Sequence, residues 1–436
     1  MTMPSLSVNG TRANAVAVPS GGVVAVVAPF GSGKHYREEI LHRGWQCVAV
    51  SPADGMLPPL YRGSLDPTGY QHVVTHDGDL ESTAHTLRAL RVTAVVAGTE
   101  IGVALTEQLA HRLGLPGNDP RTSHLRRDKG AMAAALARAG LDGPRSLSTD
   151  RLQDALSWTQ SLPDVVDFVL KPADSAGSDG VIFCSGLDEI NTAWKRLHQV
   201  PNAMGGENGH LVLQERLRGS QYVVNSVSVT DVRGAARHTI TECWADRRTP
   251  GTHLYDRLDL LHRTRLVPRV LTDYTVRALD ALGVGHGPAH TEVMYVPGRG
   301  PVLIETGARP EGTYDPHSMR EATGSDHIRD AVHAVVTGKP RRLAADRPRA
   351  TVAKISLIAP CDGVLDPVFV DRLLNLPTVH GHVGSLVPGG RVKRTVDLLT
   401  SPGRLTLAAE NPREIDHDHA LIRTMENSGL YLGGPR

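Results

Sequence analysis

Cysteine is scarce in this sequence, no apolar run is long, and neither charge is in excess. The four cysteines form no C-x-x-C pair and follow no secretory segment, so we expect reduced, mostly buried thiols in a cytoplasmic protein. No apolar run approaches the roughly 20 residues that a membrane helix needs. The 47 Lys and Arg residues nearly cancel the 46 Asp and Glu residues, which leaves no overall field for nucleic acid or an anionic membrane. A small-molecule substrate is therefore expected.

The 436 residues are too many for one hydrophobic core and predict roughly two to four packed units. Residues 1–20 have no hydrophobic periodicity, which predicts a flexible N-terminal tail. Strand-like and helix-like runs alternate over residues 21–120, which is typical of an open parallel α/β sheet. Residues 121–340 mix helices, hairpins and loops, with an expected loop over 245–261. Residues 341–436 predict a mostly β unit.

A glycine-rich stretch near the start, VVAVVAPFGSGKHY at residues 23–36, is the first candidate for a phosphate site. A P-loop has the pattern G-x-x-x-x-G-K-[ST], because its amides, lysine and hydroxyl all contact phosphate or magnesium. Ala28 and His35 stand where the first glycine and the hydroxyl should be. We therefore predict a strand, a glycine turn and a helix over 36–43, with Lys34 outside any nucleotide site.

Two glutamates are expected to face each other across a hairpin. With residues 297–300 as the turn, paired residue numbers sum to 597, which sets Glu292 opposite Glu305. Such neighbours have Cβ atoms about 4.5–5.5 Å apart, and like charges there repel. A hard divalent cation would neutralise them, since Mg²⁺ usually binds one or two carboxylates together with substrate phosphates. The alternative is a solvated pair, each glutamate drawn to an arginine such as Arg309.

A lysine before a second glycine-rich loop supplies a candidate phosphate site. In FVLKPADSAGSDGV, Lys171 ends an apolar strand beside the loop 174–180, whose free amides could close over phosphate oxygens. The alternative is an ordinary turn with a lysine that reaches solvent. Lys129, in RRDKGAMAAAL, is by itself typical of a solvated helix lysine.

Taken together, these motifs resemble the ATP-grasp superfamily in their order and spacing. A helix lysine (RDK), a strand lysine (LKP) with a glycine flap (DSAGSDGV), a hinge (LQERLRG) and two glutamates (TEV and LIETGARPEG) follow one another over residues 121–312. ETGARPEG and the stretch 241–261 are most similar to the amino-acid ligases of microbial dipeptide and peptide-antibiotic biosynthesis. The resemblance implies an α/β fold with an N-terminal open parallel α/β (pre-ATP-grasp) domain, ATP-grasp α+β lobes over 121–340 and a small β-rich C-terminal unit. The flap lobe would span about 165–215.

The resemblance also implies roles for individual residues. Phosphate contacts are expected from Lys129, Lys171, Ser175, Gly177 and Ser178. Contacts to adenine and ribose are expected from Gln214, Glu215, the main-chain amide of Leu217, and Gln221. Glu292 and Glu305 would bind the metal, and Arg309 would act with Lys171 in catalysis, facing the transferred phosphate and the substrate carboxylate. Two positions depart from the family: Gln221 where a glutamate is common, and Gly307 where many members have an asparagine that helps to hold magnesium.

The implied activity is ATP-dependent joining of a carboxylate to an amine through an acylphosphate, with release of ADP and phosphate. The implied cofactors are ATP and Mg²⁺, as one or two ions, with Mn²⁺ able to substitute. The partners would be an amino acid or peptide and ATP, with no nucleic acid or membrane, and a homodimer is left open. His290 and His317 are the candidate bases. The alternatives are a purine-pathway or carboxylase-type ATP-grasp enzyme, or a non-catalytic nucleotide-binding protein.

Overall fold

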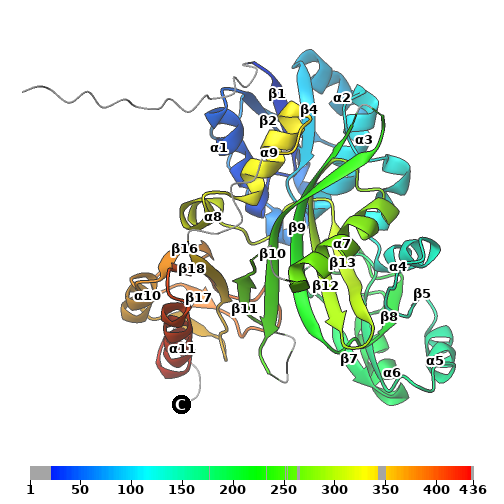
Figure 1. The fold of residues 1–436 in the computed structure, drawn as a ribbon, viewed down its shortest axis with the longest axis vertical. Helices are drawn as coiled ribbons and strands as arrows, with labels where there is room; N and C mark the ends of the chain where they lie inside the picture. The colour runs from blue at the N-terminus through cyan, green and yellow to red at the C-terminus, as the bar shows by residue number, and fades with distance from the viewer. Residues whose placement is uncertain are drawn as a thin grey trace, which may run out of the picture.

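The computed structural model describes residues 21–175, 177–231, 233–250, 252, 254–262, 266–341 and 350–433. The predicted flexible tail, residues 1–20, lies outside the described residues. Figure 1 shows the N-terminal domain in blue and cyan at the top, a green lobe at the lower right and the C-terminal unit in orange and red at the lower left. Within the described parts, no helix is long and apolar enough to cross a membrane. All four cysteines are free, and three of them are buried: Cys47, Cys184 and Cys243.

The N-terminal domain is an open parallel sheet, as predicted. Its strands are β1 (Val23–Val27), β2 (Gln46–Pro52), β3 (His72–His76) and β4 (Val92–Ala97), in the order β3-β2-β1-β4. Helix α1 (His35–His42) connects β1 to β2, α2 (Leu80–Ala89) connects β3 to β4, and α3 (Val103–Leu113) follows β4. The valine-rich runs of β1, β2 and β4 are buried almost throughout, because helices cover both faces of a parallel sheet. The winding reverses between β1 and β4, so the loops after these strands border a crevice at their carboxyl ends.

The opening glycine stretch forms the predicted strand, turn and helix. Strand β1 runs into a short 3₁₀ turn, Gly31–Lys34, and α1 begins one residue earlier than expected, at His35. A Cβ on Gly33 would lie 2.5 Å from the Cα of Gly98. Glycine is therefore needed here for the close approach of the loops after β1 and β4, and Lys34 is exposed.

The flap lobe is a four-stranded antiparallel sheet with the order β5-β8-β6-β7. Its strands are β5 (Ser146–Thr149), β6 (Asp167–Pro172), β7 (Ile182–Ser185) and β8 (Leu211–Glu215). Helix α4 (Lys129–Arg138) precedes the lobe, and α5 (Leu152–Gln160) and α6 (Leu187–Leu197) belong to it. Apolar side chains of α5 and α6 pack with Phe168, Leu170, Leu211 and Leu213 into one hydrophobic cluster.

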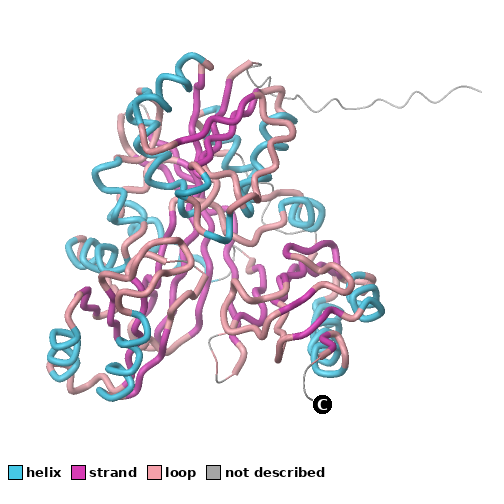
Figure 2. The backbone as a smooth tube through the Cα atoms, turned by 180° about the vertical axis from the view of Figure 1, so that it is seen from behind, coloured by secondary structure: helices cyan, strands magenta, loops and turns pink. Residues whose placement is uncertain are grey.

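A long eight-stranded sheet forms the centre of the molecule, with the order β13-β12-β9-β10-β11-β14-β18-β16. The strands are β9 (Ser220–Thr230), β10 (Ala236–Arg248), β11 (Tyr255–Leu260), β12 (Gly287–Val296), β13 (Gly300–Gly307), β14 (Thr351–Ser356), β16 (Val379–Gly384) and β18 (Gly403–Ala409). Seen from behind in Figure 2, the long strands run down through the molecule, the strands of the C-terminal unit lie at the lower right, and helices lie around the periphery. Helix α7 (Leu266–Ala281) packs on β12 and β13 through a cluster that includes Leu271, Val293 and Leu303. Helix α9 (His327–Thr337) packs beside α1, far away in sequence (Figure 1).

The expected loop over 245–261 was wrong. It is largely a hairpin, in which β10 pairs with β11 and Trp244 faces Leu260. The polar residues Asp246 and Arg257 are buried in these strands. The strands therefore lack the alternation of apolar and polar residues by which a half-buried strand is recognised in a sequence.

The C-terminal unit contains strands, as predicted, together with two helices that the sequence analysis did not expect. These are α10 (Pro367–Leu374) and α11 (Pro412–Ser428), and each begins with a proline after an Asp or Asn whose side chain caps the helix. A further small sheet joins β15 (Gly363–Leu365), β17 (Arg391–Val392) and β19 (Tyr431–Leu432). Strand β14 of this unit pairs with β11, so the unit extends the central sheet. Helix α8 (Pro316–Thr323) lies before it in the chain.

Candidate active site

The hairpin of β12 and β13 places Glu292 directly opposite Glu305, as predicted. The predicted turn is one residue too long, because Val296 already pairs with Gly300. A register shift after Glu292 leaves Ile304 as an extra residue and restores the expected pairing beyond it. The two errors cancel at the glutamate pair.

Each of these two carboxylates has its own partner. The side-chain amide of Gln221 donates to Glu292 (Nε2–Oε2, 2.8 Å), and the ammonium of Lys129 lies 3.2 Å from Glu305 Oε2. Burial opposes ionisation of Glu292, but His290 and Arg248 outweigh it and hold the pKa below its usual range. The expected alternative partner, Arg309, does not pair with either glutamate. Lys129 offsets the charge of Glu305, and Arg248, whose Nη2 lies 4.0 Å from Glu292 Oε2, offsets that of Glu292.

Two buried lysines lie beside this pair. Lys129 opens α4 and donates to the carbonyl of Ser175 (2.7 Å). Lys171, on β6, has no hydrogen-bond or ion-pair partner among the residues that the structure describes. Its burial, followed by the charge of Lys129, lowers the pKa of Lys171 to about 8. Because an unpaired buried ammonium is costly, its position favours an anionic ligand.

A cavity of about 260 Å³ lies between the flap lobe and the central sheet. Ten of the twelve predicted site residues line it: Lys129, Lys171, Ser175, Ser178, Gln214, Glu215, Leu217, Gln221, Glu292 and Glu305. Arg309 lines a small adjoining cavity that shares Lys129, Ser175 and Glu305. Gly177 lies in the flap, where its carbonyl accepts from the amide of Leu398 (3.4 Å) and its Cα packs near the Leu399 side chain. The flap is thereby held by the C-terminal unit.

Apolar side chains form much of the cavity wall, and one buried amide in it is unpaired. The sequence analysis did not identify these apolar side chains, which are Val169, Val181, Phe183, Met294 and Ile304. The Nε2 atom of Gln214 is buried there without a hydrogen-bond partner. In contrast, the carboxylate of Glu215 already accepts hydrogen bonds from Arg145 and Arg299 (2.7–2.9 Å). Any ligand contact of Glu215 would therefore use its main chain.

Strands β10 and β11 add a wall that was missed because they were expected to be a loop. The guanidinium of Arg248 lies 3.4 Å from the centre of the Tyr255 ring and 2.8 Å from Asp246 (Nη2–Oδ2). Burial raises the pKa of Asp246 to about 7, although Arg248 opposes this. Arg248 and Tyr255 both line the cavity. Only a correct pairing of β10 with β11 would have revealed them.

Gly307 makes room for a carboxylate from the N-terminal domain. Glu100, just after β4, accepts from Arg309 (Nε–Oε2, 2.8 Å). A Cβ on Gly307 would lie only 2.9 Å from Glu100 Oε2. An asparagine at this position would therefore displace Glu100. This steric conflict explains why the chain has glycine where many ATP-grasp enzymes have asparagine.

The two candidate bases differ in their surroundings. His290 lies next to the glutamate pair, with its Nε2 3.9 Å from Glu292 Oε1, and its Nδ1 contacts the Asn225 side chain at 2.9 Å. His317 lines neither cavity and pairs with Glu38. Only His290 belongs to the site.

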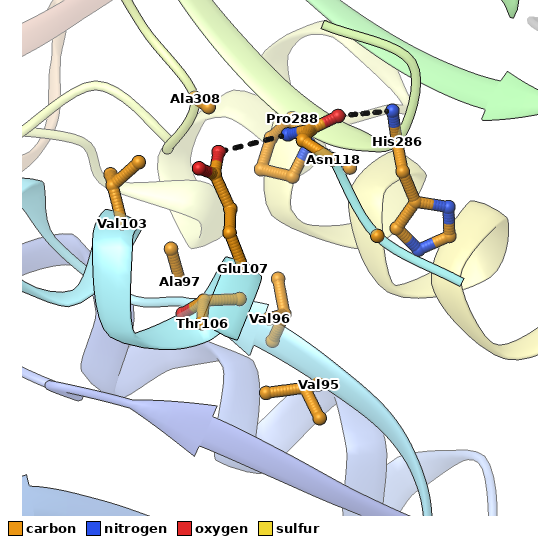
Figure 3. Close-up of a pocket in the computed structure, with 12 residues that line it drawn as sticks. Val95, Val96, Ala97, Val103, Thr106, Glu107, Asn118, His286, Pro288 and Ala308 are labelled. Carbon is orange, nitrogen blue, oxygen red and sulfur yellow. Dashed lines mark hydrogen bonds between the residues drawn. The ribbon is translucent and has the colours of Figure 1, made fainter. Parts of the chain in front are cut away.

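A separate pocket of about 20 Å³, shown in Figure 3, joins the N-terminal domain to the start of β12. Asn118 accepts from the amide of His286 (2.8 Å), and its side-chain nitrogen lies 3.4 Å from Glu107 Oε1. Apolar side chains of β4 and α3 line another part of it, together with Pro288 and Ala308. The pocket is small and its polar groups are already paired, so we interpret it as a structural contact between the two parts of the chain.

The chain is similar to known ligases over most of its length. The chain is 29% identical over 427 residues to dapdiamide A synthase from Enterobacter agglomerans, across 94% of this chain and 97% of that protein. The crystal structure of an L-amino acid ligase from Bacillus licheniformis superposes with a TM-score of 0.73 and 16% identity, over 93% of this chain and 98% of that one. The chain has the ATP-grasp fold and is a ligase.

Further relatives support the ligase assignment. Alanine–anticapsin ligase from Bacillus subtilis is 24% identical over 266 residues, 57% of this ligase and 55% of that protein. The ADP complex of an N5-carboxyaminoimidazole ribonucleotide synthetase superposes with a TM-score of 0.70 and 12% identity, over 95% and 99% of the two chains. No protein-family model matches the ligase. It binds ATP and small-molecule substrates and joins a carboxylate to an amine.

Proposed function

We propose that the ligase activates the carboxylate of an amino acid or peptide as an acylphosphate and joins it to the amine of a second amino acid, releasing ADP and phosphate. One observation carries this proposal: buried, unpaired Lys171 lines one cavity together with Lys129, two opposed glutamates and several apolar side chains. A polyphosphate fits the charged side chains, and an adenine ring fits the apolar ones.

In this proposal Lys129 and Lys171 bind the α- and β-phosphates, and the flap residues Ser175, Gly177 and Ser178 cover them. Gln214 would pair with the adenine edge, since its buried Nε2 lacks a partner. Main-chain groups of Glu215 and Leu217 would complete that contact, and Gln221 would reach the ribose.

The opposed carboxylates of Glu292 and Glu305 fit Mg²⁺, with Mn²⁺ as a substitute, because hard cations prefer oxygen ligands. A metal bound there would neutralise charge on the phosphates. To bind it, Glu305 would give up or share its contact with Lys129. That lysine would then be available to a phosphate oxygen.

The substrate acid would lie beside Arg309 and Glu100. Their opposite charges suit the carboxylate and the ammonium of an α-amino acid. An oxygen of the substrate carboxylate attacks the γ-phosphorus, and the bond from that phosphorus to the β–γ bridging oxygen breaks, so ADP leaves. The amine then attacks the carbonyl carbon and loses a proton as phosphate departs. The Arg309 guanidinium would stabilise the oxyanion of this second step.

The test is a screen of ADP release with pairs of amino acids and Mg²⁺-ATP, followed by mass spectrometry of the products. We expect ADP formation to require both an acid and an amine, and a product heavier than the acid by the mass of the amine less one water. Formation of AMP and pyrophosphate would refute the acylphosphate route. ADP release that requires bicarbonate instead of an amino acid would favour the carboxylase-type alternative.

A further inference from the structure

Helix α1 and helix α8 bring two histidines and a glutamate together outside the cavities of the active site. His35 and Glu38 are three residues apart on α1 and so share one face of it, and His317 lies in the first turn of α8. Each offers one ligand atom, and the three atoms lie within 4.8 Å of one another. Among the residues that the structure describes, no other group of three or more metal-ligating side chains meets this spacing.

We propose that His35, Glu38 and His317 bind a divalent transition-metal ion of the Zn²⁺ class. Two imidazoles and one carboxylate form a known type of zinc ligand set, in which water fills the fourth position. Imidazole nitrogens favour Zn²⁺, Ni²⁺ or Co²⁺ over Mg²⁺, which prefers oxygen. This site is independent of the proposed ATP chemistry.

The geometry is close to that of a bound ion. Ligand atoms around a tetrahedral zinc with bonds of about 2.0–2.1 Å lie roughly 3.3 Å apart, and two bound imidazoles have centroids roughly 5 Å apart. Glu38 Oε2 is already 3.0 Å from His317 Nε2, and the rings of His35 and His317 meet edge to face with centroids 6.0 Å apart. Both Glu38 and His317 are more than half exposed, so small side-chain rotations would complete the site.

His35 offers a ring nitrogen that none of the described residues occupies. Its Nε2 atom is buried and has no hydrogen-bond partner. Burial, followed by the positive charge of Lys34, lowers the pKa of His35. Among its other charged neighbours, Arg37 forms an ion pair with Asp66 (3.1 Å). Asp315 adds a negative charge near the ring.

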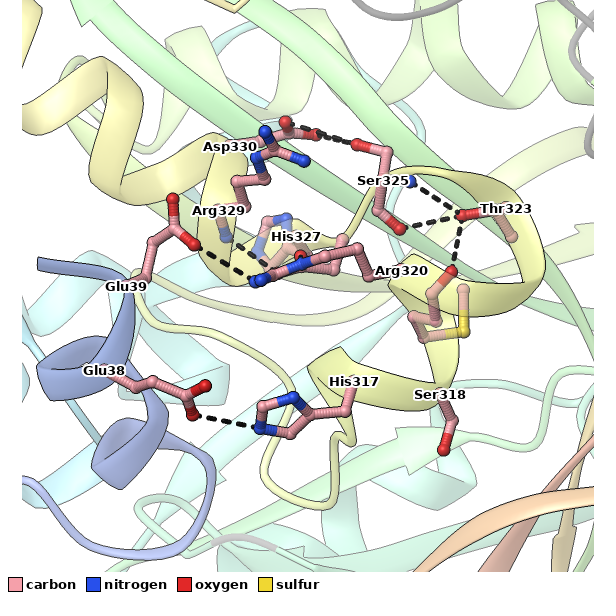
Figure 4. A network of polar contacts seen from close by, with 12 residues as sticks. Glu38, Glu39, His317, Ser318, Arg320, Thr323, Ser325, His327, Arg329 and Asp330 are labelled. Carbon is pink, nitrogen blue, oxygen red and sulfur yellow. Dashed lines mark hydrogen bonds and ion pairs between the residues drawn. The ribbon is translucent and has the colours of Figure 1, made fainter. Parts of the chain in front are cut away.

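The neighbouring carboxylate on α1 has a different role. Figure 4 shows Glu38 directed at His317, whereas Glu39 is directed at Arg320. Glu39 also pairs with Arg43 (2.8 Å) and is buried. Glu39 thus fixes α1 against α8, and Glu38 is left at the surface as a ligand.

An ion at this site would join the N-terminal domain to the segment that follows Arg309. The two are already in contact, because the amide of Tyr314 donates to Ser32 Oγ (2.9 Å). A ligand that binds only the folded state raises stability by mass action. Zn²⁺ should therefore raise the melting temperature of the ligand-free protein.

The test is titration of the full, chelator-treated chain with Zn²⁺ by calorimetry, in excess Mg²⁺ to occupy the carboxylates of the active site. We expect one Zn²⁺ per chain. His317→Ala and Glu38→Gln should each weaken binding at least tenfold and abolish the rise in melting temperature. His42→Ala removes an exposed histidine at the other end of α1 and should change neither. Co²⁺ should give the absorption bands of a low-coordinate site in the native chain and lose them in His35→Ala.

Stoichiometric Zn²⁺ binding that survives both His317→Ala and Glu38→Gln would overturn the proposal, as would the absence of binding to the native chain. If His35→Ala does not fold, the two exposed variants decide the question alone. None of these measurements includes ATP or amino acids. Their outcome is therefore separate from that of the ligase assay.

Discussion

Replacing Lys171 by methionine should stabilise the ligand-free protein while it destroys nucleotide binding. Burial, followed by the charge of Lys129, lowers the pKa of Lys171 from 10.5 to about 8. A tenfold change in proton affinity corresponds to about 1.36 kcal/mol, so protonated Lys171 lowers the free energy of unfolding by about 3 kcal/mol. Methionine fills similar space without the charge. Lys171→Met should recover most of that free energy at pH 7.

Because the pKa of Lys171 is lower in the folded chain than in the unfolded chain, its cost to stability depends on pH. Between pH 8 and 10.5 the unfolded chain holds the Lys171 proton and the folded chain does not, so the stability of the native protein rises with pH. Below pH 8 the cost is fully present, and above 10.5 it is absent. The advantage of Lys171→Met should therefore shrink from about 3 kcal/mol at pH 7 to about 1 kcal/mol at pH 10.

Urea unfolding of the ligand-free chain at pH 7 and pH 10 measures both values. Two of the four tryptophans, Trp158 and Trp194, lie in the flap lobe with Lys171, so tryptophan fluorescence follows that lobe. Lys34→Met is the matched control, because Lys34 is exposed, and it should change nothing at either pH. A Lys171→Met protein no more stable than the native one at pH 7, or equally favoured at both pH values, would refute the reasoning.

Three further outcomes are expected. Lys34→Ala should leave ATP affinity within about twofold of the native value, whereas Lys171→Ala should abolish ATP turnover; an equal loss of nucleotide binding in both would restore the P-loop interpretation. Glu305→Gln should lower the melting temperature of the ligand-free protein, because buried Lys129 loses its ion-pair partner at a cost of about 1–3 kcal/mol, and ADP formation should collapse. Normal activity of that variant at saturating Mg²⁺-ATP would remove Glu305 from the metal site. Leu399→Ala should loosen the flap and raise the rate of ADP release several-fold, with little change in melting temperature. Stopped-flow release of a fluorescent ADP analogue measures this rate, and an unchanged rate would contradict the prediction.

The N-terminal domain could be predicted well because its signals are local. Valine-rich runs separated by amphipathic helices indicate parallel strands without knowledge of any distant contact, and β1, β2 and β4 lie where such runs do. The glutamate pair was also predictable, since an antiparallel hairpin fixes which residues face each other. The bulge at Ile304 was not, because a one-residue insertion leaves no mark in the sequence.

Residues that depend on distant partners could not be predicted in this way. Glu100 is close to Arg309 only because the N-terminal domain folds onto the end of β13, more than 200 residues later. Arg248 and Asp246 are charged residues inside a sheet, where their ion pair allows both to be buried. A hydrophobicity pattern predicts that charged residues are exposed, so it does not identify them. The start of α11 is different, since the Asn411–Pro412 pair is a local capping signal that was overlooked.

The hydrogen bonding of β14 between β11 and β18 limits how this enzyme could be recombined with its relatives. A chimera that exchanges everything after residue 340 would cut through one continuous sheet, and any mismatch would leave the edge of β11 open to pairing with other chains. A crossover between α3 and α4, near residue 118, would instead separate two sheets that share no strand. The N-terminal domain could be exchanged as a cassette only if the donor supplies a carboxylate in place of Glu100 and also reproduces the face of α1 that packs on α9 and the pairing of Glu39 with Arg320.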